Sequence, residues 1–252
     1  MNANLIPHSH AARIARRDDK RRKILGFLRT EIWTLPEIVG LVAGVRDPRT
    51  ITTTVCSMER ANLLTLEECT LPSGRRVSLV GITMDGQSHI SHLLNKPIID
   101  KAHERGRAGL SQVDHRCDAQ RLHIQLAQAG WTGWKYPDRV PVAEKSQAGM
   151  HRADAITTTP TGVVVALEIE RNVKTGKRYR SIFSYHLSAL ARGDYSQVIY
   201  TSPNVVTAHA VRSLVASINQ VIVGGRETIV TPEMLSKFQF LTYSELIEGA
   251  AK

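Results

Sequence analysis

The sequence predicts a mixed α+β protein with two folded domains, and three observations support this prediction. The chain has 252 residues, a length that suits one large or two small domains. Apolar residues make up 42% of it, enough for a folded core. Helical periodicity dominates the first part of the chain, whereas the second part alternates between helical and β-like runs. The expected divisions are a disordered terminus (1–14), a first domain (15–95), a linker (96–110) and a second domain (111–252).

The first domain is expected to contain three helices followed by a hairpin. The helices are predicted over residues 18–28, 38–43 and 48–62, and the hairpin strands over 64–71 and 75–82, around a Pro-Ser-Gly turn. This order predicts a winged helix-turn-helix, in which the third helix enters the DNA major groove and the wing contacts phosphates. The alternative is a small helical cap with a hairpin.

The third helix and the wing supply the expected DNA contacts of this domain. The helix is rich in Thr, Ser and Arg, residue types that bind bases and phosphates. The wing carries two arginines at its tip. The residues expected to contact DNA here are Thr50, Thr53, Arg60, Arg75 and Arg76.

The second domain is expected to follow the order α-β-β-β-α-β. Its first helix ends at Gly130, and its second helix, over 175–191, is closed by Gly193. The predicted elements cover residues 110–129, 131–142, the hairpin 152–169, 175–191, 197–200, 206–218 and a last strand at 228–230.

Three acidic residues frame the predicted hairpin. Asp154 stands at the start of its first strand, and Glu168 and Glu170 stand at the end of its second. A hairpin brings those two ends together, and residues two apart share one face of a strand. Clustered carboxylates suit Mg²⁺ or Mn²⁺, so all three are predicted metal ligands. The alternative is a strand cap at Asp154 and surface ion pairs from the two glutamates.

Several neighbours of these acids have less specific expected roles. His151 could act as a base or bind phosphate, or it could be a surface histidine. Glu144 could complete the metal shell. Tyr179 lies between basic residues and could stack on a base.

Charge and cysteine content restrict the class of partner. The net charge is +10, and the excess is concentrated in residues 1–30 and 171–192, each of which carries a net charge of +6. Localised positive charge indicates nucleic acid, and Lys177 and Arg178 are expected to contact DNA. Three cysteines without Cys-x-x-Cys spacing favour a reducing cytoplasm, and neither a signal peptide nor a membrane segment is expected.

The second domain resembles the PD-(D/E)xK superfamily of restriction-endonuclease-like nucleases. Arg-Ala-Asp154 stands where Pro-Asp is expected, and Glu168-Ile169-Glu170 stands where (D/E)-x-K is expected. Ala153 replaces the usual Pro, and Glu170 replaces the usual Lys. The resemblance implies that Lys174 or Lys177 takes over the lysine's role at the scissile phosphate.

A narrower resemblance covers residues 15–220. A winged helix, a His-x-x-Asp strand, a Glu-x-Glu motif and then Lys174 and Arg178-Tyr179-Arg180 resemble the replication-relaxation proteins, in particular MOBC-class plasmid mobilisation relaxases. This implies a Mg²⁺- or Mn²⁺-dependent DNA endonuclease that nicks a transfer origin, with a coupling or relaxosome protein as a partner. The alternative is a non-catalytic DNA-binding regulator or replication accessory protein with an inert nuclease-like domain, which Glu170 in the lysine position favours.

Overall fold

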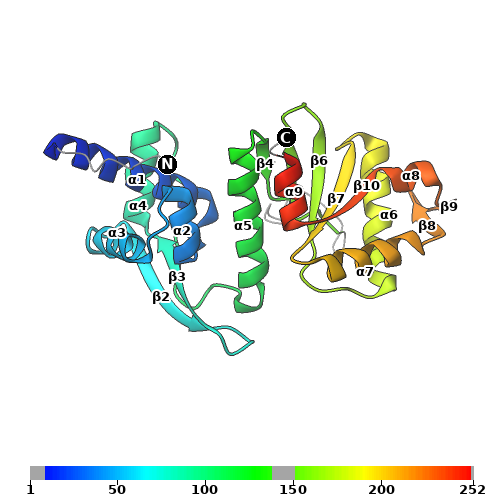
Figure 1. Cartoon of the computed structure of the whole chain (residues 1–252), viewed down its shortest axis with the longest axis horizontal. Coiled ribbons are helices and arrows are strands. Elements are labelled where there is room, and N and C mark those ends of the chain that lie inside the picture. The colour runs from blue at the N-terminus through cyan, green and yellow to red at the C-terminus, as the bar shows by residue number, and fades with distance from the viewer. Residues whose placement is uncertain (1–8, 138–150, 251–252) are drawn as a thin grey trace. The chain divides into compact units, whose positions relative to one another are not determined.

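The computed structural model describes residues 9–137 and 151–250. They form a mixed α+β protein that divides into two compact units, Met1–Cys117 and Asp118–Lys252 (Figure 1). The helices are α1 His10–Glu31, α2 Pro36–Ala43, α3 Pro48–Arg60, α4 Met84–Leu94, the 3₁₀ helix η1 Leu110–Gln112, α5 Val113–Gln128, α6 Gly176–Arg192, α7 Val205–Ala216, α8 Pro232–Ser236 and α9 Tyr243–Ala250. The strands are β1 Trp33–Thr34, β2 Leu64–Thr70, β3 Arg76–Ile82, β4 Thr132–Lys135, β5 Ala155–Thr158, β6 Val164–Ile169, β7 Gln197–Ser202, β8 Gln220–Val223, β9 Arg226–Ile229 and β10 Phe238–Thr242.

The first unit packs helices against a small antiparallel sheet of strand order β1-β3-β2. Leu25 and Leu28 of α1, Met58 of α3 and Ile82 of β3 meet in its core, where all four side chains are buried. The periodicity of apolar residues predicted α3 and the β2–β3 hairpin, and both are present at nearly the expected positions.

The first helix is longer than the sequence analysis predicted. It begins at His10 rather than at residue 18, so the expected disorder of residues 1–14 is wrong for 10–14, while 1–8 lie outside the described residues. Ser9 caps the helix by accepting a hydrogen bond of 3.1 Å from the Ala12 N–H. The residues that follow are mainly Ala and Arg, which favour a helix even without an apolar stripe.

The expected linker at 96–110 belongs to the first unit. The His103 N–H donates to the Ile82 carbonyl at 2.8 Å, and the His103 Nε2 lies 2.7 Å from the Glu67 Oε2. The His103 side chain packs on Gly81, where a Cβ atom would come within 2.2 Å of it. Polar composition had suggested a solvated linker, but these residues find their hydrogen-bond partners on β2 and β3.

The second unit is built on a mixed sheet of strand order β10-β7-β6-β5-β4. Strands β4, β5 and β6 form an antiparallel meander, and α6 carries the chain over to β7, which is parallel to β6. β10 adds a parallel edge strand that the sequence analysis missed. The predicted last strand overlaps β9, which pairs only with β8 in a separate ribbon.

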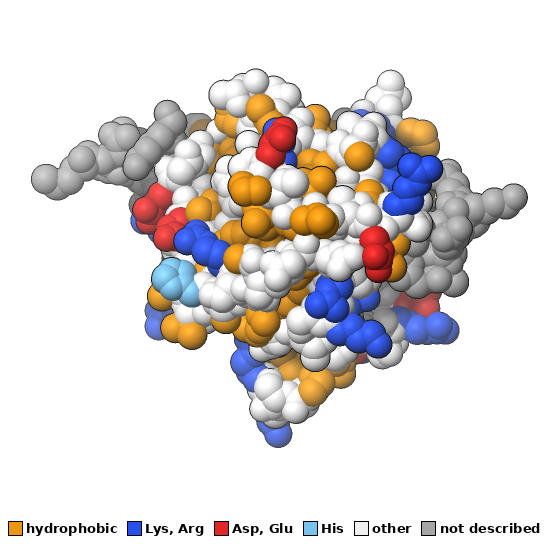
Figure 2. Space-filling model, turned by 90° about the vertical axis from the view of Figure 1, so that its right-hand side faces the viewer, with side chains coloured by type: hydrophobic (Ala, Val, Ile, Leu, Met, Phe, Trp, Pro, Cys, Tyr) orange, Lys and Arg blue, Asp and Glu red, His pale blue; other side chains and the backbone are white. Residues whose placement is uncertain are grey.

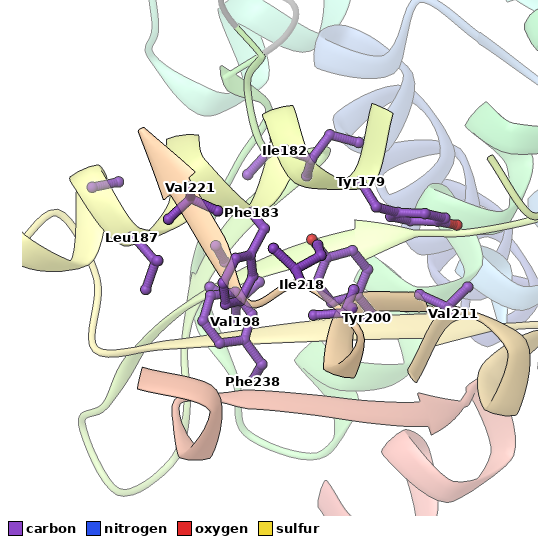
Figure 3. Packing of buried hydrophobic residues seen from close by; sticks show 14 of the residues in the cluster. Tyr179, Ile182, Phe183, Leu187, Val198, Tyr200, Val211, Ile218, Val221 and Phe238 are labelled. Atoms are coloured by element: carbon purple, nitrogen blue, oxygen red, sulfur yellow. The ribbon is translucent and has the colours of Figure 1, made fainter. Parts of the chain in front are cut away.

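One face of this sheet is covered by the apolar side of α6 (Figure 3). Tyr179, Ile182, Phe183 and Leu187 recur at helical spacing, and all are buried. The rings of Phe183 and Phe238 lie 4.5 Å apart, so α6 packs directly over the β10 edge.

The side of the second unit that carries β8 and β9 in Figure 1 faces the viewer in Figure 2, where apolar side chains lie among scattered charges. Ile222 of β8 and Ile229 of β9 are among its exposed apolar residues. Among residues 9–137 and 151–250, no helix is both long enough and apolar enough to cross a membrane.

Candidate functional site

The predicted hairpin brings the three acidic residues together. Ala155 pairs with Leu167 across β5 and β6, so Asp154 and Glu168 are the next positions along the same two strands. The Asp154 Oδ2 accepts a 2.7 Å hydrogen bond from the Ile169 N–H. The convergence predicted from turn chemistry and alternation is therefore confirmed.

Glu168 and Glu170 belong to the face of the sheet that α6 covers. Ile156 and Ala166 pack into the core beneath α6, and side chains alternate along a strand. Glu168 and Glu170 have the same parity as Ala166, and Asp154 lies beside them just before β5 begins. Acidic side chains on this face lie beside a core, where an uncompensated charge is costly.

Glu168 is hydrogen-bonded by two histidines. Its side chain is 1% exposed, and its Oε1 accepts hydrogen bonds from the His151 Nε2 at 2.7 Å and the His186 Nε2 at 2.9 Å. The His186 Nδ1 lies 2.6 Å from the hydroxyl of Tyr195. We refer to His151, Glu168, His186 and Tyr195 as the Glu168 cluster. It joins the segment before β5, the end of β6, the middle of α6 and the loop before β7.

The electrostatics of the cluster favour an ionised glutamate. Burial raises the pKa of Glu168, but hydrogen bonds and charge from His151 and His186 outweigh burial and hold that pKa at about 2. Burial also raises the pKa of Tyr195 far above its ordinary value, with a smaller contribution from Glu168. Tyr195 therefore keeps its proton and can donate it in a hydrogen bond to His186.

The Glu168 cluster contains a donor set for a metal ion. One ligand atom from each of His151, Glu168 and His186 can be chosen so that all three lie within 4.8 Å of one another. Two imidazoles and a carboxylate form a common set for Zn²⁺, Fe²⁺ or Mn²⁺, and they are a poorer set for Mg²⁺, which prefers oxygen. This set shares only Glu168 with the predicted ligands Asp154, Glu168 and Glu170.

Glu170 is held differently. Its side chain is 1% exposed, and its Oε1 accepts a hydrogen bond from Lys174 Nζ, whose own side chain is 37% exposed. Burial raises the pKa of Glu170, Lys174 opposes this, and the Glu168 and Asp154 carboxylates raise the pKa further. Lys174 thus lies where the resemblance expects a replacement for the motif lysine, beside the acidic residue that occupies the lysine position.

Tyr179 cannot stack on a base, because its side chain is completely buried. The Lys174 N–H donates to its hydroxyl at 3.3 Å. Burial and the nearby Glu170 carboxylate raise the pKa of Tyr179 to about 12. Its role is to support the turn that presents Lys174. Lys177 and Arg178 are exposed in the first turn of α6, where DNA could reach them.

Of the residues expected to contact DNA in the first unit, some are exposed and others already have partners within the protein. Thr53, Arg60 and Arg76 are exposed. The Thr50 hydroxyl donates to the Asp47 Oδ2 at 2.5 Å as part of the α3 N-cap, and Arg75 pairs with Asp114.

His186 and Tyr195 are the members of the cluster that sequence reasoning missed. His186 follows Phe183 by three residues and Tyr179 by seven, so it falls on the apolar stripe of α6. A histidine at such a position was the available signal, since a buried imidazole needs a polar partner. Glu144, the predicted additional ligand, lies outside the described residues.

Comparisons with protein-family models, curated proteins and solved structures give no match for this chain.

Proposed function

We propose that this chain is a DNA-binding, divalent-metal-dependent endonuclease. In this proposal the first unit is a winged helix-turn-helix that binds duplex DNA, and the second is a restriction-endonuclease-like domain that cleaves one phosphodiester bond. The order α5-β4-β5-β6-α6-β7 supports the second assignment. The observation that carries the proposal is the convergence of Asp154, Glu168 and Glu170 where the start of β5 meets the end of β6.

The donor chemistry fits a divalent cation. Glu168, His151 and His186 would hold it, with Asp154 on the adjoining strand as a further oxygen donor. Of the two ions expected from the sequence, Mn²⁺ is the better match because imidazole nitrogens are in the set. When bound, such an ion supplies a Lewis acid and lowers the pKa of a coordinated water.

The chain's own residues would position the substrate. Lys174 Nζ, at the partly exposed end of the Glu170 ion pair, would contact a non-bridging oxygen of the scissile phosphate. Glu170 would hold that ammonium group in place. Lys177 and Arg178, exposed on the next turn, would bind the flanking phosphates. His151, 10% exposed, is the cluster member nearest to solvent, so the substrate would approach the cation from its side.

The resemblance to MOBC-class relaxases makes a plasmid transfer origin the proposed substrate, and a coupling or relaxosome protein the proposed partner.

The test is the nicking of supercoiled DNA that carries such an origin, in the presence of Mn²⁺, Mg²⁺ or a chelator. We expect Mn²⁺ to support nicking best. Asp154→Asn, Glu168→Gln and Lys174→Ala should each lower the rate by about two orders of magnitude or more, whereas the exposed Glu227→Gln should not. Parent rates in Asp154→Asn and Glu168→Gln would refute the metal-dependent mechanism.

A second candidate is a DNA-binding regulator or replication accessory protein without catalysis. The observation that favours it is internal satisfaction of the acidic groups, because Glu168 already accepts hydrogen bonds from His151 and His186 and Lys174 already pairs with Glu170. It predicts DNA binding without nicking under any metal condition. If the parent chain binds no DNA, both candidate functions are wrong.

A further inference from the structure

A groove in the first unit is lined only by basic and hydroxyl-bearing side chains. It lies between α1 and α3 and has a volume of about 320 Å³. Its lining residues are Arg13, Arg16, Arg17, Lys20, Arg21, Thr53, Thr54 and Ser57. We refer to them as the basic groove. None of them is acidic, so the groove presents concentrated positive charge beside hydrogen-bonding groups.

The cations of the groove form one stripe along α1. Arg13, Arg16, Arg17, Lys20 and Arg21 recur at intervals of three and four residues, which places them on one helical face. Like charges at these spacings oppose helix formation by about 0.2–0.5 kcal/mol per pair. Most of the cations in the stripe have no acidic partner among the described residues.

The acidic residues of α1 compensate only one of the five cations. Arg17 pairs with Asp18 at 3.0 Å, while Asp19 pairs with Arg22 and Lys23, which lie outside the groove. Arg13, Arg16 and Lys20 have no ion pair among the described residues. These three side chains are available to an anionic ligand.

The α3 side of the groove supplies hydroxyl groups. The Arg21 Nη2 donates to the Ser57 Oγ at 3.0 Å, which ties the two helices together. The Thr54 hydroxyl donates a hydrogen bond to the Thr50 carbonyl at 2.8 Å, so its proton is already engaged. Thr53 is exposed and makes no side-chain hydrogen bond within the described chain, so its hydroxyl can bind a ligand.

The outer part of α1 lacks the packing that normally maintains a helix. Residues 9–18 are exposed, and the first turn contains no acidic side chain to favour the helix dipole. Helical segments without apolar burial are marginal in water. An anion bound along the stripe would stabilise this segment by removing the repulsion among its cations.

We propose that the basic groove binds the phosphate backbone of DNA, which makes α1 and α3 together a phosphate clamp. The stripe from Arg13 to Lys20 extends about 10 Å along the helix axis, enough for about three successive phosphates of one strand. Thr53 then contacts a phosphate rather than a base, which differs from the base-reading role expected for α3. This inference rests on the DNA-binding part of the proposed function.

The test uses the full-length chain and measures affinity by fluorescence anisotropy over a range of salt concentrations. The probes are one duplex and one single strand of the same arbitrary sequence. The groove variant combines Arg13→Gln, Arg16→Gln and Lys20→Gln, and the control combines Lys96→Gln, Lys101→Gln and Lys237→Gln, which remove the same charge from exposed sites elsewhere. Gln maintains helix propensity, and circular dichroism checks that α1 persists.

We expect the groove variant to reduce the slope of log K against log salt by about 2.7 for duplex and about 2 for single strand, since each lost phosphate contact removes about 0.9 or 0.7. At 0.1 M salt this corresponds to a loss of affinity of roughly 10²–10³-fold. Thr53→Ala should weaken binding to this duplex and to a second duplex of unrelated sequence by the same factor, and Thr53→Ser should restore it. If the groove and control variants bind with the same slope, the groove inference is wrong while DNA binding stands. A parent chain that binds neither probe overturns both.

Discussion

The basic groove and the Glu168 cluster hold charged side chains in opposite ways. In the groove, Arg13, Arg16 and Lys20 remain at the surface without ion pairs among the described residues. In the cluster, Glu168 is removed from water and accepts hydrogen bonds from His151 and His186. Charges left in water attract a partner and are screened by salt. A buried charge instead depends on its hydrogen-bond partners inside the protein, and the loss of one partner destabilises the folded state.

The largest expected effect comes from breaking the cluster at His186. His186→Ala removes a buried donor to Glu168 and leaves a cavity, so we expect a loss of about 3–5 kcal/mol in the free energy of unfolding. Urea denaturation of the full-length chain measures this. His186→Gln, which retains a donor, should recover part of the loss, and the exposed Arg180→Ala should change the stability by less than about 0.5 kcal/mol. Equal stability of His186→Ala and the parent would show that the cluster does not maintain the fold.

A second prediction concerns pH. The folded pKa of Glu168 is about 2, below its ordinary value of 4.5, so its ionised form stabilises the folded state above about pH 4.5. That contribution, roughly 3 kcal/mol, should disappear as the pH falls from about 5 towards 2. The difference in unfolding free energy between the parent and Glu168→Gln should therefore shrink through this window. A difference that is constant from pH 6 to pH 3 would contradict the low pKa.

A third prediction compares Glu170 with Glu168. The pKa of Glu170 is raised where that of Glu168 is lowered, so its neutral form is better tolerated. Lys174 is partly exposed and can be rehydrated when its partner is lost. We expect Glu170→Gln to change the unfolding free energy by less than about 1 kcal/mol, because the ion pair is partly screened by solvent. A larger loss than in Glu168→Gln would reverse the assignment of the two roles.

The smallest expected effect distinguishes the two arginines of the predicted wing. Arg75 pairs with Asp114, whereas Arg76 is exposed beside it. Arg76→Ala should therefore reduce the salt dependence of DNA binding by about one phosphate contact, a slope change of about 0.9. Arg75→Ala should reduce it by less, since Arg75 must leave Asp114 before it binds DNA. Equal slopes in the two variants would show that the ion pair does not persist in solution.

The elements predicted best from the sequence are those set by local chemistry. Gly193 closes α6 in the left-handed conformation, with φ of 78°, as its position after an apolar stripe suggested. The pairing of β5 with β6 follows from β-branched runs around a Thr-Pro-Thr-Gly turn. By contrast, β10 is only five residues long and becomes a strand because β7 offers a free edge. No local pattern could indicate that edge.

The sequence by itself determined that Asp154, Glu168 and Glu170 converge, because alternation and a tight turn allow one outcome for a hairpin. The cation stripe of α1 was not predicted, because the helix was expected to begin only at residue 18 and its exposed outer part has no apolar stripe. Only the tertiary structure decided that His186 hydrogen-bonds Glu168 and that α3 lies beside the stripe. Those contacts join segments that are 18 or more residues apart in the chain, and a side chain's partners and ionisation depend on what packs around it rather than on its neighbours in sequence.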